Sequence, residues 1–148
     1  MNDRFRENPD GILTDTEKQI EWLPKDSYLD LGCWRNWQDA KAYALLMNSI
    51  YAGGHSNWRL PTQEEALGLY DPEMTVMDYK GKEVHIHSSF APVCGYKIWT
   101  SEVNDEDKVF TLNLRDGTSE YLPKTDEKFL CARLVRDIPK EPVQSLDP

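Results

Sequence analysis

The chain has 148 residues, of which 39% are hydrophobic and 11% aromatic, which is typical of one globular domain and not of a disordered segment. Its formal net charge of −9 argues against nucleic acid and anionic membranes as partners. No apolar run approaches the length of a membrane span, and the first ten residues lack the apolar core of a signal peptide. We therefore expect no membrane insertion, and either a cytoplasmic protein or an exported one whose leader has been removed.

The first third of the chain predicts short strands, a loop and one long helix. Residues 1–22 predict two extended segments around a turn at Asp10-Gly11, and residues 23–35 predict a loop. Apolar residues then recur at three- and four-residue steps from about Gln38 to Tyr51, which indicates an amphipathic helix. Asn36 can cap the start of this helix, and Gly53-Gly54 can end it.

The stretch from Ser56 to Leu67 combines three local signals. Trp58 and Leu60 alternate with polar residues and predict a short buried strand. Pro61 stops that strand because proline has no amide hydrogen for a ladder. Thr62 and Glu65 form a capping-box pattern, which predicts a second, shorter helix to about residue 70.

The remainder predicts an irregular region followed by a β-meander. Residues 71–97 lack a clear period, with one short strand at 84–87, and so long an irregular stretch is usually functional or mobile. Strands follow at 96–100, 109–114, 120–122 and 129–135, with an acidic loop at 102–107 and a hairpin turn at 115–118. The last strand is nearly all apolar, which predicts a place at the centre of the sheet. Residues 137–148 predict a flexible tail.

Five motifs occur in a characteristic order along the chain. They are Arg4-Phe5 with Asn8, Asp10-Gly11, Thr14-Asp15 and Trp22; Trp37-Gln38-Asp39-Ala40; Trp58 to Thr62 with Glu65; Trp99-Thr100-Ser101; and Arg133-Leu134-Val135-Arg136. Together they resemble the C-terminal domain of the Legionella collagen-like (Lcl) protein family. The chain departs from that family at Lys18-Gln19, where a glycine is usual, and at Cys131, which lies outside the closing quartet.

The resemblance implies an α+β fold of the C-type-lectin-like class, with two helices flanking a curved antiparallel sheet, long irregular loops and termini close together. It implies a single domain over residues 1–136. Arg59-Leu60-Pro61-Thr62 is also similar to the formylglycine-generating-enzyme (sulfatase-modifying factor) family, which shares that fold. The Lcl likeness implies bacterial surface attachment or adhesion through a protein or glycan ligand. Members of that family can bind sulfated polysaccharides, which suit an acidic chain poorly unless it carries a local basic patch.

Two clusters could hold a metal ion. His85 and His87 lie two apart on the predicted strand, so both could face one transition metal, with His55 or a carboxylate as third ligand. They could equally be surface imidazoles. Oxygen ligands gather in the acidic loop, as calcium prefers, although a solvated charge cluster explains them as well. These oxygen ligands are Glu102, Asn104, Asp105 and Asp107. No cofactor is firmly predicted, and calcium is the one this loop would suit.

A binding module is the function that the sequence favours, with its ligand held by residues of 71–97, 102–107 and 113–128. Tyr96 and Trp99 could stack on a sugar or peptide, or be core residues of the first meander strand. The predicted ligand-binding residues are Tyr96, Trp99, Glu102, Asn104, Asp105 and Arg115.

The alternative is a metal-dependent or redox enzyme on a formylglycine-generating-enzyme-like scaffold. That family needs a pair of nearby C-terminal cysteines, and here only Cys131 lies in that region. Cys33 and Cys94 have no basic neighbour in sequence to lower the pKa of a thiol. One disulfide could form among the three cysteines, although reduced, buried thiols fit them better. No catalytic residue is predicted.

Overall fold

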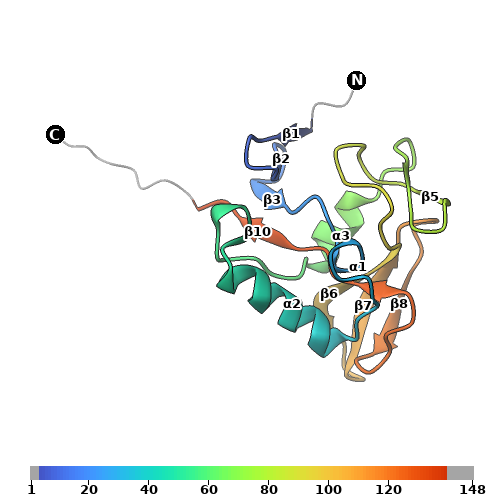
Figure 1. Cartoon of the computed structure of the whole chain (residues 1–148). Helices are drawn as coiled ribbons and strands as arrows, with labels where there is room; N and C mark the ends of the chain where they lie inside the picture. The colour runs from blue at the N-terminus through green and yellow to red at the C-terminus, as the bar shows by residue number, and fades with distance from the viewer. Residues whose placement is uncertain (1–3, 140–148) are drawn as a thin grey trace.

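The computed structural model describes residues 4–139 and shows an α+β fold (Figure 1). The helices are α1 (Ser27–Leu31), α2 (Trp37–Ser49) and α3 (Gln63–Leu69), with a short 3-10 turn at Ala52–Gly54. The strands are β1 (Phe5–Glu7), β2 (Leu13–Asp15), β3 (Ile20–Trp22), β4 (Val76–Met77), β5 (Glu83–Val84), β6 (Lys97–Val103), β7 (Lys108–Asn113), β8 (Ser119–Pro123), β9 (Leu130–Cys131) and β10 (Val135–Asp137).

One sheet joins the two ends of the described chain, in the order β1-β2-β3-β10, with every pair antiparallel. The N-terminal segment therefore forms three strands, where the sequence predicted two extended segments. Asp137, which we expected to begin the tail, is the last residue of β10. The rest of the predicted tail, from residue 140 on, lies outside the described residues.

The second four-stranded sheet has the order β8-β7-β6-β9, and β9 runs parallel to β6 at its edge. The register of β6 and β7 shifts between Trp99 and Val103, as at a β-bulge that bends a strand. The prediction of one central strand at 129–135 is wrong. That run divides into β9 in this sheet and β10 in the other, and it is apolar because both parts are buried.

The helices begin where local capping signals place them. Asn36 accepts a hydrogen bond from Asp39 N at the start of α2, and Thr62 and Glu65 form a complete capping box at the start of α3. The predicted loop at 23–35 contains a helix, α1, which Asp26 caps and which ends at Gly32 in the left-handed conformation. The strand predicted at 84–87 is only Glu83–Val84.

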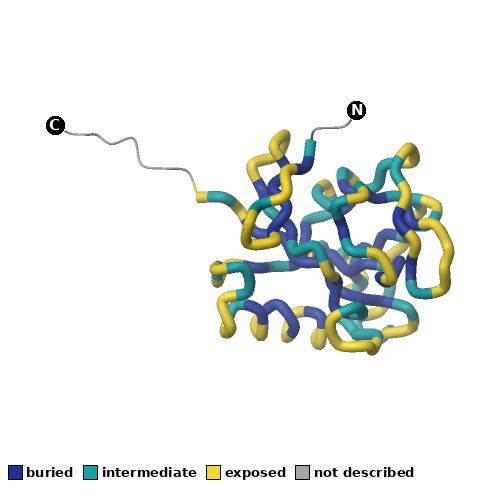
Figure 2. Tube along the Cα trace, turned by 45° about the horizontal axis from the view of Figure 1, so that its top comes forward, coloured by how far each residue is buried: buried dark blue, intermediate teal, exposed yellow. Residues whose placement is uncertain are grey.

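Buried residues form two neighbouring clusters, one under the β1-β2-β3-β10 sheet and the 71–97 region, the other between α2 and the β8-β7-β6-β9 sheet. Figure 2 shows this buried interior, with exposed residues on the outer turns of α2 and on the loops. Within residues 4–139 no helix is long and apolar enough to cross a membrane.

Candidate functional site

Strand β6 separates the predicted ligand-binding residues into two groups. Tyr96 precedes the strand and Asn104 follows it, and seven residues of extended chain span about 20 Å. Trp99 lies between them, fully buried, with its indole nitrogen donating to Arg35 O at 2.8 Å. Trp99 is therefore a core residue, the second of the two roles open to it, and no ligand at the surface can stack on it. Tyr96 and the β6–β7 turn cannot contact one small ligand.

The β6–β7 turn uses its polar atoms internally. Asn104 Oδ1 accepts from the backbone of Glu106 and Lys108, at 2.9 and 3.0 Å, and Asp107 pairs with Lys124 at 2.6 Å. Glu102 lies within β6, and Asp105 is exposed at the turn. Side chains already committed in this way leave few free oxygens for an ion.

The two histidines do not share a strand face. His85 Nδ1 lies 2.9 Å from Met74 O, and Tyr70 packs edge-on against its ring. His87 Nδ1 accepts from Ser89 N, and its ring lies 5.1 Å from that of Phe5. Among residues 4–139, no three His, Cys, Asp or Glu side chains are grouped to hold a metal ion.

Five aromatic rings from separate parts of the chain gather at one face, and we call them the aromatic surface. Tyr28 stacks on Trp34 with ring centroids 4.0 Å apart, and Tyr79 meets both rings edge-on or tilted at 5.0–5.1 Å. Phe129 lies 5.7 Å from Trp34 and 5.9 Å from Tyr96. Tyr96 is 9% exposed and the other four are half-buried. Solvent therefore reaches the four half-buried residues, whereas Tyr96 lies almost wholly inside the protein.

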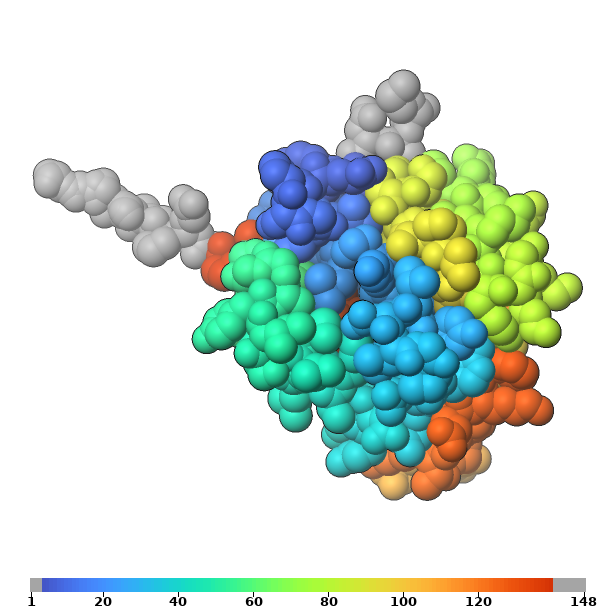
Figure 3. Space-filling view, viewed as in Figure 1, coloured from blue at the N-terminus to red at the C-terminus, as the bar shows by residue number. Residues whose placement is uncertain are grey.

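Figure 3 shows the chain segments that meet there. The α1 segment, light blue, lies in the middle of that view, with the 71–97 region in green to yellow and the β7–β8 segment in orange beside it. Two of the three regions predicted to bind a ligand, 71–97 and 113–128, are thus neighbours. Backbone hydrogen bonds join them, from His85 N to Leu114 O and from Leu114 N to Tyr96 O.

Charged side chains border the aromatic surface. The Arg115 guanidinium lies 3.6 Å from the centroid of the Tyr96 ring, a cation–π contact. Its Nε donates to the buried carboxylate of Asp78 at 2.7 Å. Burial raises the pKa of the Tyr79 and Tyr96 hydroxyls, and Arg115 opposes that shift. Both phenols are therefore neutral donors at physiological pH.

Strained backbone accompanies these rings. Phe129 has φ of +63° and Val93 has φ of +64°, in the left-handed region that bulky and β-branched residues rarely adopt. Such conformations persist only where the surrounding structure enforces them, and they are common at binding and catalytic sites. A Cβ on Gly95 would lie 2.8 Å from Cys131 Sγ and 3.0 Å from the Trp34 ring, so only glycine fits between them.

A buried carboxylate lies directly beneath the aromatic surface. Asp26 accepts hydrogen bonds from Leu29 N at 2.9 Å and Gly95 N at 2.7 Å. The Cys131 thiol lies 3.5 Å from the same carboxylate, and Arg133 lies 3.7 Å from it. Asp26 therefore joins α1, the 71–97 region and β9 under the rings.

The three cysteines are free thiols, Cys33 exposed and the others buried. The expectation of buried thiols thus holds for Cys94 and Cys131 and is wrong for Cys33. Burial raises the pKa of both buried thiols. Neither is therefore a thiolate at neutral pH, the form that a nucleophile or metal ligand requires.

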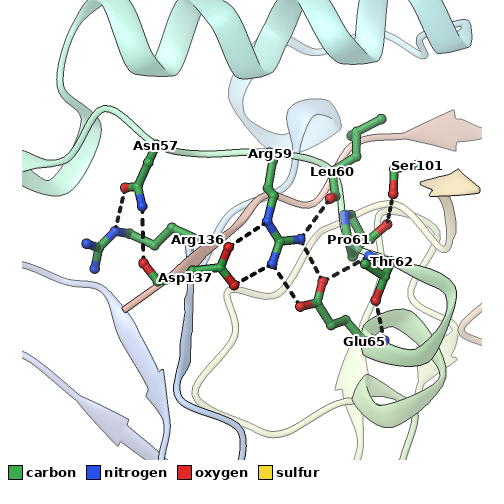
Figure 4. Close-up of polar contacts among 9 residues, drawn as sticks. All are labelled: Asn57, Arg59, Leu60, Pro61, Thr62, Glu65, Ser101, Arg136 and Asp137. Carbon is green, nitrogen blue, oxygen red and sulfur yellow. Dashed lines mark hydrogen bonds and ion pairs between the residues drawn. The ribbon is translucent and has the colours of Figure 1, made fainter. Parts of the chain in front are cut away.

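The corner from Asn57 to Glu65 is a second organised region (Figure 4). Arg59 forms a single antiparallel bridge with Val135, so the predicted strand is reduced to that bridge. Its guanidinium makes two hydrogen bonds to Glu65, at 2.8 and 2.9 Å, and two to Asp137, at 2.8 and 3.3 Å. Leu60 points from this corner toward α2 and borders a hollow of about 380 Å³, which Arg59 and Asp137 also line.

Sequence reasoning identified Tyr96 and Arg115 but missed the other four rings of the aromatic surface. Tyr28 lies in a helix that the pattern did not reveal, Trp34 follows that helix, and Tyr79 lies in the irregular region.

Comparison with known proteins gives one family. A family model described as the Lcl C-terminal domain matches residues 11–136. No curated protein and no solved structure matches the chain.

Proposed function

We propose that this chain, which belongs to the Lcl C-terminal domain family, is a non-catalytic binding module that recognises a glycan through its aromatic surface, without calcium. The observation that supports this is the gathering of five rings from separate chain segments, four of them half-buried and Tyr96 buried, with centroid distances of 4.0–6.4 Å between neighbours. Ring faces and edges bind the C–H groups of sugars, and the phenol hydroxyls can hydrogen-bond sugar hydroxyls. The rings are held in place before a ligand arrives, which lowers the entropy lost on binding.

Unpaired lysines around the rings favour an acidic glycan. Lys80 follows Tyr79, Lys128 precedes Phe129, and Lys82 lies in the same turn as Lys80. None of the three pairs with a carboxylate within residues 4–139. They supply a local positive charge on a chain whose net charge is −9, so acidic glycans remain candidates despite that total. Binding of this kind would weaken as salt is raised.

A C-type-lectin-like architecture would suit this role, and we infer it from two features. The first and last described strands lie in one sheet with two strands between them, so the ends of the domain are about 15 Å apart at the usual strand spacing. The irregular 71–97 region lies on the face that carries the rings. Ends this close together suit a domain that is attached to a larger protein, as surface adhesion requires. A crystal structure superposed on lectin-like domains would test the architecture.

The test of the function is a glycan array that includes neutral, carboxylated and sulfated sugars, followed by affinity measurement in solution. The Tyr79→Leu variant removes one half-buried ring. Because a stacked ring contributes about 0.5–1.5 kcal/mol, we expect the affinity to fall about two- to tenfold. The matched control is Tyr121→Leu, an aromatic ring 43% exposed on β8, outside the aromatic surface. Both variants must keep the far-UV spectrum and cooperative unfolding of the original chain.

The proposal fails if the array yields no ligand, or if Tyr121→Leu weakens binding as much as Tyr79→Leu does. Lys80→Gln combined with Lys128→Gln separates acidic from neutral ligands. For an acidic glycan this double variant should bind more weakly and lose most of the salt dependence. For a neutral glycan it should change neither quantity.

A further inference from the structure

A groove lined by Arg59, Asp137 and the residues around them has no role in the proposed function. Its hollow of about 380 Å³ lies between α2 and the Trp58–Thr62 corner. Buried Ala44, Trp58 and Leu60 form its floor, and the exposed residues Lys41, Ser101 and Asp137 form its rim. Ser101 lies five residues along β6 from Tyr96, so the groove is about 15 Å from the aromatic surface.

The walls of the groove are fixed by hydrogen bonds that satisfy the backbone of the corner. Asn48 on α2 accepts from Trp58 N at 2.6 Å and donates to Trp58 O at 3.0 Å. The indole of Trp58 donates to Ala52 O at 2.9 Å, and Ser101 N donates to Pro61 O at 2.9 Å. The volume and the apolar floor match those of preformed ligand sites.

The concave path continues past Thr62 into a second hollow of about 450 Å³. Thr62 lines both hollows, and Glu64, Leu67 and Glu102 line only the second. Leu67, 43% exposed, adds apolar surface in the second hollow, and Leu45, 70% exposed, lies one helical turn from Lys41 on α2. A path of two joined hollows suits an extended chain better than a compact small molecule.

The charges along this path differ at its two ends. At the α2 end, Lys41 lies over the Trp37 ring at 3.9 Å and pairs with no carboxylate among residues 4–139. At the α3 end, Glu64 and Glu102 pair with no cation in that part of the chain. Arg59, between them, pairs with both Asp137 and Glu65, so its positive charge is already matched by carboxylates of this chain. An occupant with an acidic group at one end and a basic group at the other would therefore match the groove.

We propose that this groove binds an extended peptide segment of a partner protein. Along the groove the segment places an acidic side chain at Lys41, a bulky apolar side chain over Trp58 and Leu60, and a basic side chain at Glu64 and Glu102. The apolar side chain is the anchor, because a buried apolar group in a preformed pocket contributes most to such interfaces. The two charged ends fix the direction of the peptide.

The test is selection of a random 12-residue phage-displayed peptide library on the immobilised full chain, followed by fluorescence anisotropy with a synthetic selected peptide. We expect the selected peptides to carry a large apolar residue between an acidic and a basic one. Ser101→Trp, which fills the hollow from its exposed rim, should weaken binding at least tenfold. Lys41→Trp is a second filling variant if Ser101→Trp unfolds the domain. Tyr79→Leu should leave peptide binding unchanged, which separates this site from the glycan surface.

Charge reversal tests the direction. Lys41→Glu should weaken the peptide about threefold, and replacing the acidic residue of the peptide by lysine should restore the affinity. Lys18→Glu, an exposed reversal on the N-terminal turn, is the matched control and should have no effect. The proposal is overturned if selection yields no peptide, or if Ser101→Trp binds the peptide as well as the original chain does. It is also overturned if Ser101→Trp turns a dimer into a monomer in sedimentation, since a second copy would then occupy the groove.

Discussion

Replacing Arg59 by methionine tests whether the corner and β10 are held together by one guanidinium. Methionine keeps most of the aliphatic stem but removes five hydrogen bonds, two to Glu65, two to Asp137 and one to Leu60 O. Glu65 keeps its contact with Thr62 N at 2.9 Å, so the cap of α3 survives. The experiment therefore removes the ion pairs without removing the helix start.

The contact of Arg59 with Glu65 and its contact with Asp137 differ in burial, and therefore in how much each contributes to the free energy of unfolding. The side chain of Glu65 is 16% exposed and that of Asp137 is 69% exposed, while Arg59 itself is 33% exposed. Hydrogen bonds to charged groups contribute about 1.5–3 kcal/mol when shielded, and exposed pairs about 0.2–1 kcal/mol. The low end of the first range for the Glu65 contact and the middle of the second range for the Asp137 contact give about 2 kcal/mol in total. For a chain of this length, the midpoint of thermal unfolding should fall by about 4–8 °C.

Urea and thermal unfolding of two double-mutant cycles would measure the coupling free energy of Arg59 with Glu65 and with Asp137. Arg59→Met with Glu65→Gln should show a coupling of about 1 kcal/mol, and Arg59→Met with Asp137→Asn about half of that. Arg6→Met, on the exposed edge of β1, is the control and should stay within about 0.5 kcal/mol of the original chain. The reasoning is wrong if Arg59→Met and Glu65→Gln have additive effects, or if Arg59 couples more strongly to Asp137 than to Glu65. Burial would then not determine the strength of the two contacts.

Three further outcomes follow from the same structure. Burial raises the pKa of Glu65, but hydrogen bonds from Arg59 and Thr62 more than offset it, and Arg59 also lowers the pKa of Asp137. These carboxylates stabilise the fold above their unfolded pKa values of about 4, and that contribution disappears as the pH falls through the lower folded values. Unfolding midpoints should drop below about pH 4–5, and by less in Arg59→Met. Iodoacetamide at pH 8 should modify one thiol in the native protein, Cys33, and three after unfolding; a second equivalent in the native state would contradict the burial of Cys94 and Cys131. Millimolar calcium should leave the thermal midpoint unchanged, because the turn after β6 already uses its Asn104 oxygen; a rise of several degrees would restore the calcium-site prediction.

Signals that act within a few residues were predictable from the sequence. The cap of α2 at Asn36, the capping box of Thr62 and Glu65, and the turn at Gly117 all occur as expected. In each case the interacting groups are at most four residues apart, so the sequence contains both partners of the hydrogen bond or the one glycine that the conformation requires. Helix α2 and the β6–β7–β8 meander also appear within a few residues of their predicted bounds.

The division of residues 129–135 between two sheets could not be predicted from the apolar run alone. Leu130 and Cys131 pair with β6, whereas Val135 pairs with Trp22 of β3. A run buried on both faces has the same composition whether it is one central strand or two short strands in adjoining sheets. Only the partner strands distinguish these cases, and β3 lies more than 100 residues away in the sequence.

Asp26 shows why the aromatic surface was harder to predict than the helices around it. Its place before Ser27 and six residues before Gly32 was a helix-start signal, but α1 has only five residues and no apolar period to support that signal. Its other partners, Gly95 and Cys131, are 69 and 105 residues away. A buried carboxylate is costly unless several donors satisfy it, so Asp26 fixes the distance between the segments that carry Tyr28, Tyr96 and Phe129. Asp26→Asn keeps an acceptor for Leu29 N but places an amide NH₂ group where Oδ2 accepts from both Gly95 N and the Cys131 thiol. We therefore expect it to disturb the arrangement of the rings, and with it glycan binding, more than it lowers the stability of β9.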